Sequence, residues 1–367
     1  MPELFGRALS RRELEARVGS LDQLAGITEL THDTGRGKGV RILRLCTGPL
    51  TVEIVADRAL DIVHATYLGV PFVWRSANDL AAPAYYDARG DEWLRSFFGG
   101  WLTTCGLSNF GPAGSDASGD FGLHGRIDNT PAEQISAVTR WDCDRCVLEV
   151  EGTVRETKAL STRLVLRRRW WSELGSATLH LEDRVRNEGG EPAPHMILYH
   201  CNAGFPLVDA ATRVYVSHNA IAPRDAAAAS GLARWNYGGE PQAGFREQVF
   251  ILEPRACRDG KARGVIVNAG LLDGGGLGFE VTFDPTALPA IFTWRKLGFG
   301  DYVMSLEPAN TAAIQGRAYA GAHAMLPFLE PGEERIYALE FAALTRDALR
   351  ESIATIESAN ATAAAPR

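Results

Sequence analysis

A histidine and an amide side chain stand two residues apart in an otherwise largely apolar stretch, residues 196–208. The two residues are His200 and Asn202. In a β-strand, residues i and i+2 point to the same face, so both side chains would project together. Histidine changes its charge near neutral pH and serves as a general acid or base. This segment is therefore a candidate part of a reactive site, with His200 as its acid/base group.

Two polar segments elsewhere in the chain could supply partners for His200. The first is Leu-His-Gly-Arg at 123–126, where His124 follows a polar, glycine-rich stretch and Gly125 would let the backbone approach a ligand. The second contains Glu307, which ends a mostly apolar run and precedes a proline. Partial burial at a strand end raises the pKa of a carboxyl toward the value that suits a general base. Together, two imidazoles and one carboxylate would support proton transfer near neutral pH.

Each of these residues also has a purely structural interpretation. His124 could be a turn histidine bonded to backbone atoms, and Glu307 could pair with a nearby arginine. The segment before Glu307 adds an aromatic surface at Trp294 and polar groups at Lys296 and Asp301. Aromatic faces beside polar groups suit sugar rings, whose C–H faces are apolar and whose rims carry hydroxyl groups.

Charge and hydropathy narrow the classes of partner. The chain has 367 residues and a formal net charge of -7, and its one basic run is 167–169. This acidic balance argues against a nucleic-acid partner. No apolar run approaches the roughly 18 residues of a membrane span, and the N-terminus has no signal-peptide pattern. We expect a cytoplasmic protein with no membrane partner, and the sequence leaves the oligomeric state open, a homodimer included.

Short strands must position the candidate residues. Roughly a dozen or more runs of branched and aromatic residues, many separated by turn-forming residues, indicate an all-β sandwich or barrel. Before them, residues 10–18 predict a short helix, because Ser10 can cap it and Glu13 stands three residues later, as in a capping box. The predicted organisation is an N-terminal extension over 1–30, a single β domain over 31–350 and a disordered or helical tail over 351–367.

Five short motifs follow one another along nearly the whole chain. They are DRALDI at 57–62, FGGWLTTCGL at 98–107, LHGR at 123–126, YHCNAG at 199–204 and LEPAN at 306–310. In these motifs the chain resembles the aldose 1-epimerase (galactose mutarotase-like) superfamily, and more closely its branch called domain of unknown function 4432. The resemblance implies a β-supersandwich of two large antiparallel sheets, which agrees with the strand pattern.

The resemblance also implies roles for individual residues. In mutarotases a Leu-His-Gly motif supplies one active-site histidine, which matches His124. A second histidine supplies the general acid, matching His200, and a glutamate in the C-terminal third supplies the general base, matching Glu307. The usual His-x-Tyr-Phe-Asn pattern is replaced here by His-Cys-Asn-Ala-Gly, which leaves the substrate orientation, and the reaction itself, open.

The reaction expected from this resemblance is the interconversion of sugar anomers. Glu307 would take the proton of the anomeric hydroxyl while His200 protonates the ring oxygen, so that the pyranose opens and recloses. His124 would hydrogen-bond the ring oxygen or a neighbouring hydroxyl, and no cofactor would be required. The candidate substrate-binding residues are Arg58, Arg126, Asn202, Trp294, Lys296 and Asp301.

Two other functions stay open from the sequence. One is a sugar isomerase or epimerase that moves a carbon-bound proton, in which His124, His200 and Glu307 could bind a divalent metal ion that stabilises an enolate. The other is a non-catalytic carbohydrate-binding protein on the same scaffold, because a fold does not determine a function.

Overall fold

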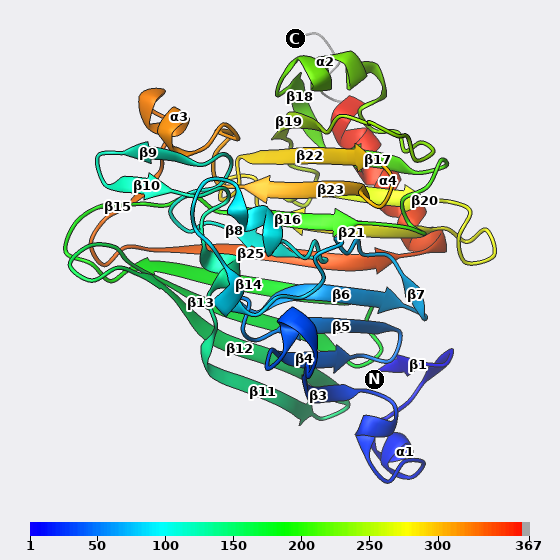
Figure 1. Cartoon of the computed structure of the whole chain (residues 1–367). Coiled ribbons are helices and arrows are strands. Elements are labelled where there is room, and N and C mark those ends of the chain that lie inside the picture. The colour runs from blue at the N-terminus through cyan, green and yellow to red at the C-terminus, as the bar shows by residue number, and fades with distance from the viewer. Residues whose placement is uncertain (362–367) are drawn as a thin grey trace.

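Antiparallel strands arranged in two layers form the framework of the fold (Figure 1). The computed structural model describes residues 1–361. One layer is an antiparallel sheet of eight strands. In spatial order these strands are β11 (Glu133–Asp142), β12 (Arg145–Thr157), β13 (Arg163–Glu173), β14 (Thr178–Asn187), β25 (Glu334–Leu344), β21 (Leu277–Phe283), β20 (Ala262–Asn268) and β17 (Arg213–Val216).

The second layer joins two antiparallel sheets. The six-stranded sheet contains, in spatial order, β18 (His218–Pro223), β19 (Gln248–Pro254), β22 (Ala290–Leu297), β23 (Tyr302–Ala309), β16 (Leu198–Ala203) and β8 (Thr103–Cys105). The five-stranded sheet contains β3 (Gly26–Thr31), β4 (Arg41–Cys46), β5 (Leu50–Val55), β6 (Asp61–Tyr67) and β7 (Val70–Pro71). A bridge between Ile62 and Leu102 links the two sheets where they adjoin.

The remaining elements are short strands, α-helices and 3-10 turns outside the three large sheets. Three two-stranded sheets pair β1 (Glu3–Leu4) with β2 (Arg7–Ala8), β9 (Gly114–Asp116) with β10 (Gly119–Phe121), and β15 (Ala193–Pro194) with β24 (Phe328–Leu329). The α-helices are α1 (Arg11–Glu15), α2 (Ala226–Gly231), α3 (Arg317–Ala322) and α4 (Arg346–Ala361). Single 3-10 turns lie at Leu21–Gln23, Gly35–Gly37, Pro83–Tyr85, Glu92–Arg95, Ile127–Asn129 and Leu232–Arg234.

The six-stranded sheet is covered on both faces. One face packs toward the eight-stranded sheet, in a core that includes Tyr199 and Leu306. The other face packs against aromatic residues of the long connection between β7 and β11, among them Trp93 and Phe97. All six residues of β16 are buried for this reason. A polar side chain on the covered outer face is thus shielded from water without being part of the inter-sheet core.

The predicted all-β sandwich is confirmed, with its second layer divided into two adjoining sheets. The predicted short helix is also confirmed as α1, in which Ser10 and Glu13 form the expected capping box.

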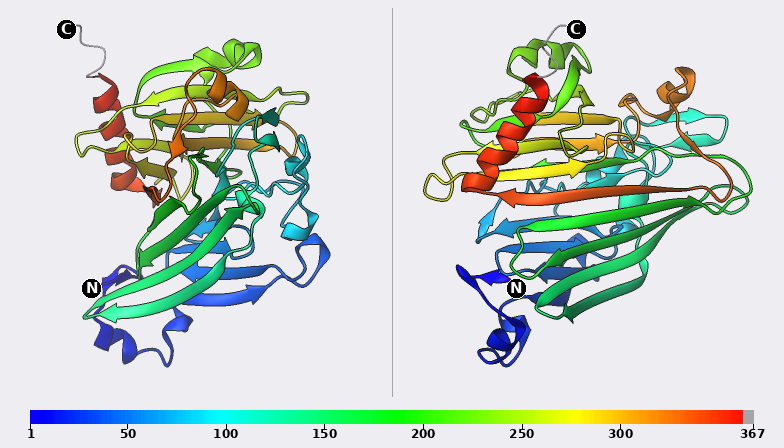
Figure 2. Two further views of the ribbon diagram at one scale, coloured as in Figure 1. Left: turned by 90° about the vertical axis from the view of Figure 1, so that its left-hand side faces the viewer. Right: turned by 180° about the vertical axis from the view of Figure 1, so that it is seen from behind.

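Two elements cross the predicted domain boundaries. Strand β3 starts within the predicted extension 1–30 and belongs to the sheet, and α4 crosses the predicted boundary at 350. Figure 2 shows α4 lying across the strands at one end of the eight-stranded sheet, where Leu349 and Ile356 pack on Val265 and Val267. The end of the predicted tail, 362–367, lies outside the described residues. No helix within 1–361 combines the length and apolar character of a membrane span.

Candidate active site

The pairing of β16 with β23 brings the two central candidates together. Asn202 lies opposite Ser305 in this antiparallel pair, and Cys201 lies opposite Leu306, so His200 stands beside Glu307 on the outer face. The distance from His200 Nε2 to Glu307 Oε1 is 3.4 Å. Both side chains are almost fully buried, with 7% and 3% of their surface exposed. His200 and Glu307, which are 107 residues apart in the sequence, are thus in contact.

Burial shifts the pKa of Glu307 upward. Loss of solvent disfavours the charged carboxylate and raises its pKa to about 7. The hydroxyl of Ser305 opposes this by donating a 2.5 Å hydrogen bond to Oε1, and Arg224 opposes it through its charge. The carboxyl group therefore changes its charge near neutral pH, which suits a general base.

Burial shifts the pKa of His200 in the other direction. Loss of solvent disfavours the imidazolium and lowers the pKa to about 4, although the Asn202 amide favours the charged form. The rings of Phe97 and Trp294 lie on either side, each with its centroid 5.4 Å from that of His200. Because the two groups are in contact, they titrate as a pair that carries one proton over the intermediate pH range.

The second histidine projects from a turn whose backbone is unusual. His124 and Gly125 both have positive φ, 56° and 75°. A Cβ atom on Gly125 would come within 2.3 Å of the carbonyl oxygen of Gly106, so this position requires glycine. The turn explains the Leu-His-Gly motif, because it directs the His124 ring toward the sheet.

The hydrogen bonding of His124 defines its protonation. The backbone N–H of Gly111 donates to His124 Nδ1 at 3.3 Å, which assigns the ring hydrogen to Nε2. Loss of solvent, and then the neighbouring His200, lower the pKa of His124 to about 3. The two imidazole centroids are 5.9 Å apart. His124 is therefore a neutral hydrogen-bond donor next to the His200–Glu307 pair.

These residues line a cavity of about 440 Å³. This volume lies within the range of roughly 300 to 1,000 Å³ that small-molecule sites occupy. Trp93, Phe97 and Trp294 form aromatic walls, and the charged residues Arg224 and Glu247 line it with His124, His200 and Glu307. The arrangement offers apolar faces, hydrogen-bond donors and one acid/base pair in a single cavity.

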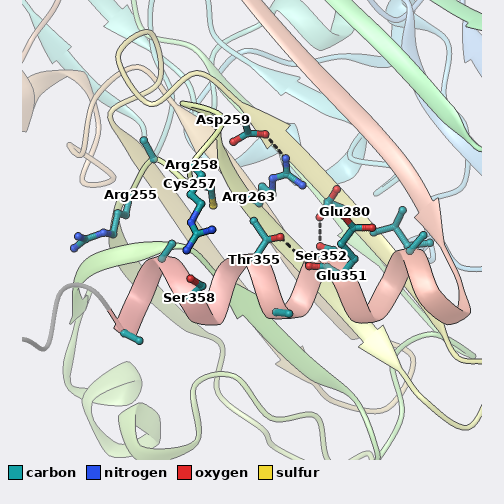
Figure 3. Close-up of a pocket in the computed structure, with 16 residues that line it drawn as sticks. Arg255, Cys257, Arg258, Asp259, Arg263, Glu280, Glu351, Ser352, Thr355 and Ser358 are labelled. Carbon is teal, nitrogen blue, oxygen red and sulfur yellow. Dashed lines mark hydrogen bonds and ion pairs between the residues drawn. The ribbon is translucent and has the colours of Figure 1, made fainter.

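A larger hollow of about 1180 Å³ lies elsewhere, between α4 and the strands beneath it (Figure 3). Arg263 pairs with Asp259 in this hollow, and Ser352 of α4 donates a hydrogen bond to Glu280 of β21. The lining that the structure describes contains no histidine. The cavity at His200 is therefore the candidate active site.

The sequence was compared with known families, and residues 37–343 match the family described as Domain of unknown function (DUF4432). The chain belongs to the DUF4432 family. Among the curated proteins, none matches the sequence significantly.

Solved structures show the same fold as this DUF4432 protein. A proposed aldose 1-epimerase from Klebsiella pneumoniae has a TM-score of 0.83 at 23% identity, covering 94% of this chain and 90% of its own. A galactose mutarotase-like protein from Clostridium acetobutylicum has a TM-score of 0.61 at 15% identity, covering 88% and 99%. A galactose 1-epimerase from Lactobacillus acidophilus has a TM-score of 0.54 at 10% identity, covering 88% and 99%. At these identities the likeness establishes the fold.

Of the residues expected to bind substrate, only Trp294 lines the cavity of the DUF4432 protein. The expectation for Arg58 is wrong: it is fully buried and bonded to Asp128 at 3.0 Å and to backbone carbonyls, so it has no free donor for a ligand. Asn202 lies behind His200, with its Nδ2 donating to the carbonyl of Gly100.

Three further expectations are corrected in the same way. Arg126 is exposed and does not line the cavity, although Leu123 and His124 of the same motif do. Lys296 and Asp301 lie toward the far end of the β22–β23 hairpin, beyond Trp294, and neither lines the cavity.

The cavity also contains an ion pair that the sequence did not suggest. Arg224 Nη2 lies 2.8 Å from Glu247 Oε1, and the indole Nε1 of Trp294 donates to Glu247 Oε2 at 3.1 Å. Arg224 follows β18 and Glu247 precedes β19, so their contact depends on the pairing of these strands. No local motif marks either residue.

The metal-dependent alternative stays a prediction. Within residues 1–361, no three His, Cys, Asp or Glu side chains are grouped as ligands of a metal ion. The set of His124, His200 and Glu307 is therefore not arranged for shared ligation in this conformation.

Proposed function

We propose that the protein interconverts the anomers of an aldose or aldose derivative by opening and reclosing the sugar ring. The observation that supports this most directly is the 3.4 Å contact between His200 and Glu307 in the cavity lining. Solved structures named as aldose 1-epimerase or mutarotase-like share the fold, which is consistent with a sugar substrate.

The closeness of the two groups suits this reaction. Anomer exchange removes a proton from the anomeric hydroxyl and adds one to the ring oxygen, and both oxygens are bonded to the same carbon. An acid and a base in contact with each other can therefore serve both oxygens of one bound sugar. The pair holds the single proton that the reaction needs over the intermediate pH range.

In the proposed first step, the Glu307 carboxylate removes the proton of the anomeric hydroxyl, and the His200 imidazolium gives its Nε2 proton to the ring oxygen. The bond between C1 and the ring oxygen breaks, and the hydroxyl oxygen on C1 becomes the carbonyl oxygen of the open-chain aldehyde. Rotation about the C1–C2 bond and reversal of both transfers close the ring as the other anomer. Both side chains return to their starting protonation states, so the cycle needs no cofactor.

The remaining cavity residues would bind and orient the sugar. His124 is assigned the role of a donor, because the bond from Gly111 to Nδ1 places the ring hydrogen on Nε2 and the low pKa keeps the ring neutral. Trp294 and Phe97 provide aromatic surface for the apolar face of a pyranose. A sugar that fills the cavity displaces water from it, which strengthens the hydrogen bonds to the ring.

The test is the rate at which a freshly dissolved aldose reaches its equilibrium optical rotation. We expect Glu307→Gln and His200→Asn each to lower the catalysed rate about 10²- to 10⁴-fold, because each removes one proton-transfer group. The matched control is Glu253→Gln, which changes an exposed carboxylate on β19 outside the cavity and should leave the rate unchanged. Wild-type rates in both cavity variants would overturn the proposal.

A further inference from the structure

A second pair of polar side chains lies next to His200 and Glu307 on the same sheet face. Asn202 on β16 is directly opposite Ser305 on β23. Both are buried, at 0% and 1% exposure, and neither lines the cavity. Each is two residues from one of the reacting groups, so each projects beside it.

The Ser305 hydroxyl is fixed from both sides. It accepts a hydrogen bond of 2.9 Å from the backbone N–H of Trp294 on β22, and it donates the 2.5 Å bond to Glu307 Oε1. The single hydrogen of this hydroxyl has two acceptors within reach, the carbonyl oxygen of Trp294 at 3.3 Å and the Glu307 carboxylate at 2.5 Å, and the bond to the carboxylate is much the shorter. Ser305 thus connects the backbone of the neighbouring strand to the carboxylate that would act as base.

The Asn202 amide is fixed in a comparable way. Its Nδ2 donates to the carbonyl oxygens of Gly100, at 3.2 Å, and of His200, at 3.0 Å. The other end of the amide, Oδ1, is buried, as is His200 Nδ1, and among the described residues neither atom has a well-formed hydrogen bond. Oδ1 can only accept, and Nδ1–H can donate to it. The Asn202 Oδ1 and the His200 Nδ1–H are thus a complementary acceptor and donor, and neither has another hydrogen-bond partner among the described residues.

We propose that Ser305 and Asn202 are positioning residues of this site: Ser305 orients the carboxylate of Glu307, and Asn202 orients the ring of His200 with its Nε2 toward that carboxylate. This inference rests on the proposed function, because it assigns the two residues to the same acid/base pair. It also explains why an amide stands at position 202, where the ordinary mutarotase pattern has an aromatic residue.

The two positioning residues act in opposite senses on the pair. Ser305 lowers the pKa of Glu307 against the rise due to burial, and the Asn202 amide raises the pKa of His200 against the fall due to burial. Both effects favour the form in which the carboxylate and the imidazolium are charged at once. That form is the one from which the proposed ring opening starts.

The test compares Ser305→Ala, Ser305→Thr and Asn202→Ala in pH profiles of kcat/KM. In Ser305→Ala we expect the alkaline limb to move up by about one pH unit and the maximal value to fall about tenfold, because the carboxylate loses a charge-assisted hydrogen bond. Ser305→Thr keeps the hydroxyl and should keep the wild-type limb. Asn202→Ala should move the acid limb down and also lower the maximum.

Ser352→Ala is the matched control, because Ser352 is another buried serine that donates to a buried glutamate, Glu280, outside the candidate site. It should leave both limbs in place. Loss of activity in Ser305→Ala and Asn202→Ala with both limbs unmoved would mean that the two residues only support packing, and it would overturn the inference.

A second measurement separates this inference from the proposed function. The infrared absorption of the protonated carboxyl of Glu307, assigned by its disappearance in Glu307→Gln, can be followed against pH without any substrate. We expect its titration to move to higher pH in Ser305→Ala and to stay in place in Ser352→Ala. An inactive wild type would contradict the proposed function alone, whereas an unmoved titration in Ser305→Ala would contradict the role of Ser305.

Discussion

At the scale of single residues, burial reverses the order of the two pKa values, so that the pKa of Glu307 lies above that of His200. Burial raises the pKa of Glu307 to about 7 and lowers that of His200 to about 4. Below both values the pair carries two protons, between them one, and above them none. Only the singly protonated pair contains both an acceptor for the anomeric proton and a donor for the ring oxygen.

We therefore expect kcat/KM to form a bell in pH, with its maximum between about 4 and about 7. The rate falls on the acid side because the pair takes up a second proton and has no acceptor left, and on the alkaline side because the pair loses its last proton and has no donor left. The profile is measured from the rate of change of optical rotation at a series of pH values on both sides of the maximum. A rate that continues to rise above the pKa of Glu307 would contradict the shared-proton pair.

Strand geometry made part of the site predictable at this scale. His200 and Glu307 stood out because each is a titratable residue in an apolar run, and His124 because of its motif. Arg58 was misassigned because its partner Asp128 is 70 residues away and invisible to local reasoning. Arg224 and Glu247 were missed for the same reason, since they meet only where β18 pairs with β19.

At the scale of elements, a buried ionic network ties the two layers together. Arg168 on β13 lies 2.6 Å from both Asp61 on β6 and Asp183 on β14, and all three side chains are fully buried. Thr104 on β8 and Tyr199 on β16 bond to the same network. Strand β16, which carries His200, is therefore connected to the opposite sheet by directional bonds.

Breaking this network should destabilise the fold strongly. We expect Asp61→Asn to lower the free energy of unfolding by about 3 to 5 kcal/mol, because it leaves part of the charge on buried Arg168 uncompensated. The control is Asp57→Asn in the same sequence motif. Asp57 pairs with Arg41, whose side chain is 52% exposed, so its loss should cost about 1 kcal/mol or less.

Urea unfolding of the two variants and the wild type measures both effects. Equal losses in Asp61→Asn and Asp57→Asn would contradict the importance of the buried network. The segment 57–62 contains two aspartates, the partly exposed Asp57 and the fully buried Asp61, which only the tertiary structure distinguishes.

At the scale of the whole molecule, the sandwich was predictable from the many short apolar runs, because only stacked sheets bury so many strands of that length. The packing of the C-terminal helix was not predictable in this way. In the sequence, the segment of α4 belongs to an alanine-rich tail, yet its residues Leu349 and Ile356 are buried against the eight-stranded sheet. The apolar face of α4 is buried only because the strands β20 and β21 lie beneath it.

Buried neutral histidines should make the whole fold sensitive to acid. His195 is fully buried, bonded to the Leu107 carbonyl and the Tyr337 hydroxyl, and burial lowers its pKa from 6.5 to about 4. Because the folded-state pKa is the lower one, its contribution to stability is present above pH 6.5 and is lost as the pH falls toward about 4. The difference corresponds to about 3 kcal/mol.

We expect His195→Asn to reduce the steepness with which stability falls between these pH values, because the variant no longer takes up a proton at this position on unfolding. His124 and His200 retain their own contributions, so the slope is reduced and not abolished. The control is His323→Asn on the exposed surface, which should keep the wild-type slope. Denaturant unfolding at several pH values measures it, and an unchanged slope in His195→Asn would contradict this assignment.

The central claim is that the cavity catalyses anomer exchange through oxygen-bound protons. The most direct measurement is NMR of the purified protein with a panel of aldoses, ketoses and uronates in deuterium oxide, with and without a chelator. The account predicts faster exchange between the anomers of at least one aldose, insensitive to the chelator, with every carbon-bound hydrogen retained and the acceleration lost in Glu307→Gln. Deuterium entering a carbon position, or binding of a sugar with no acceleration in the whole panel, would contradict it.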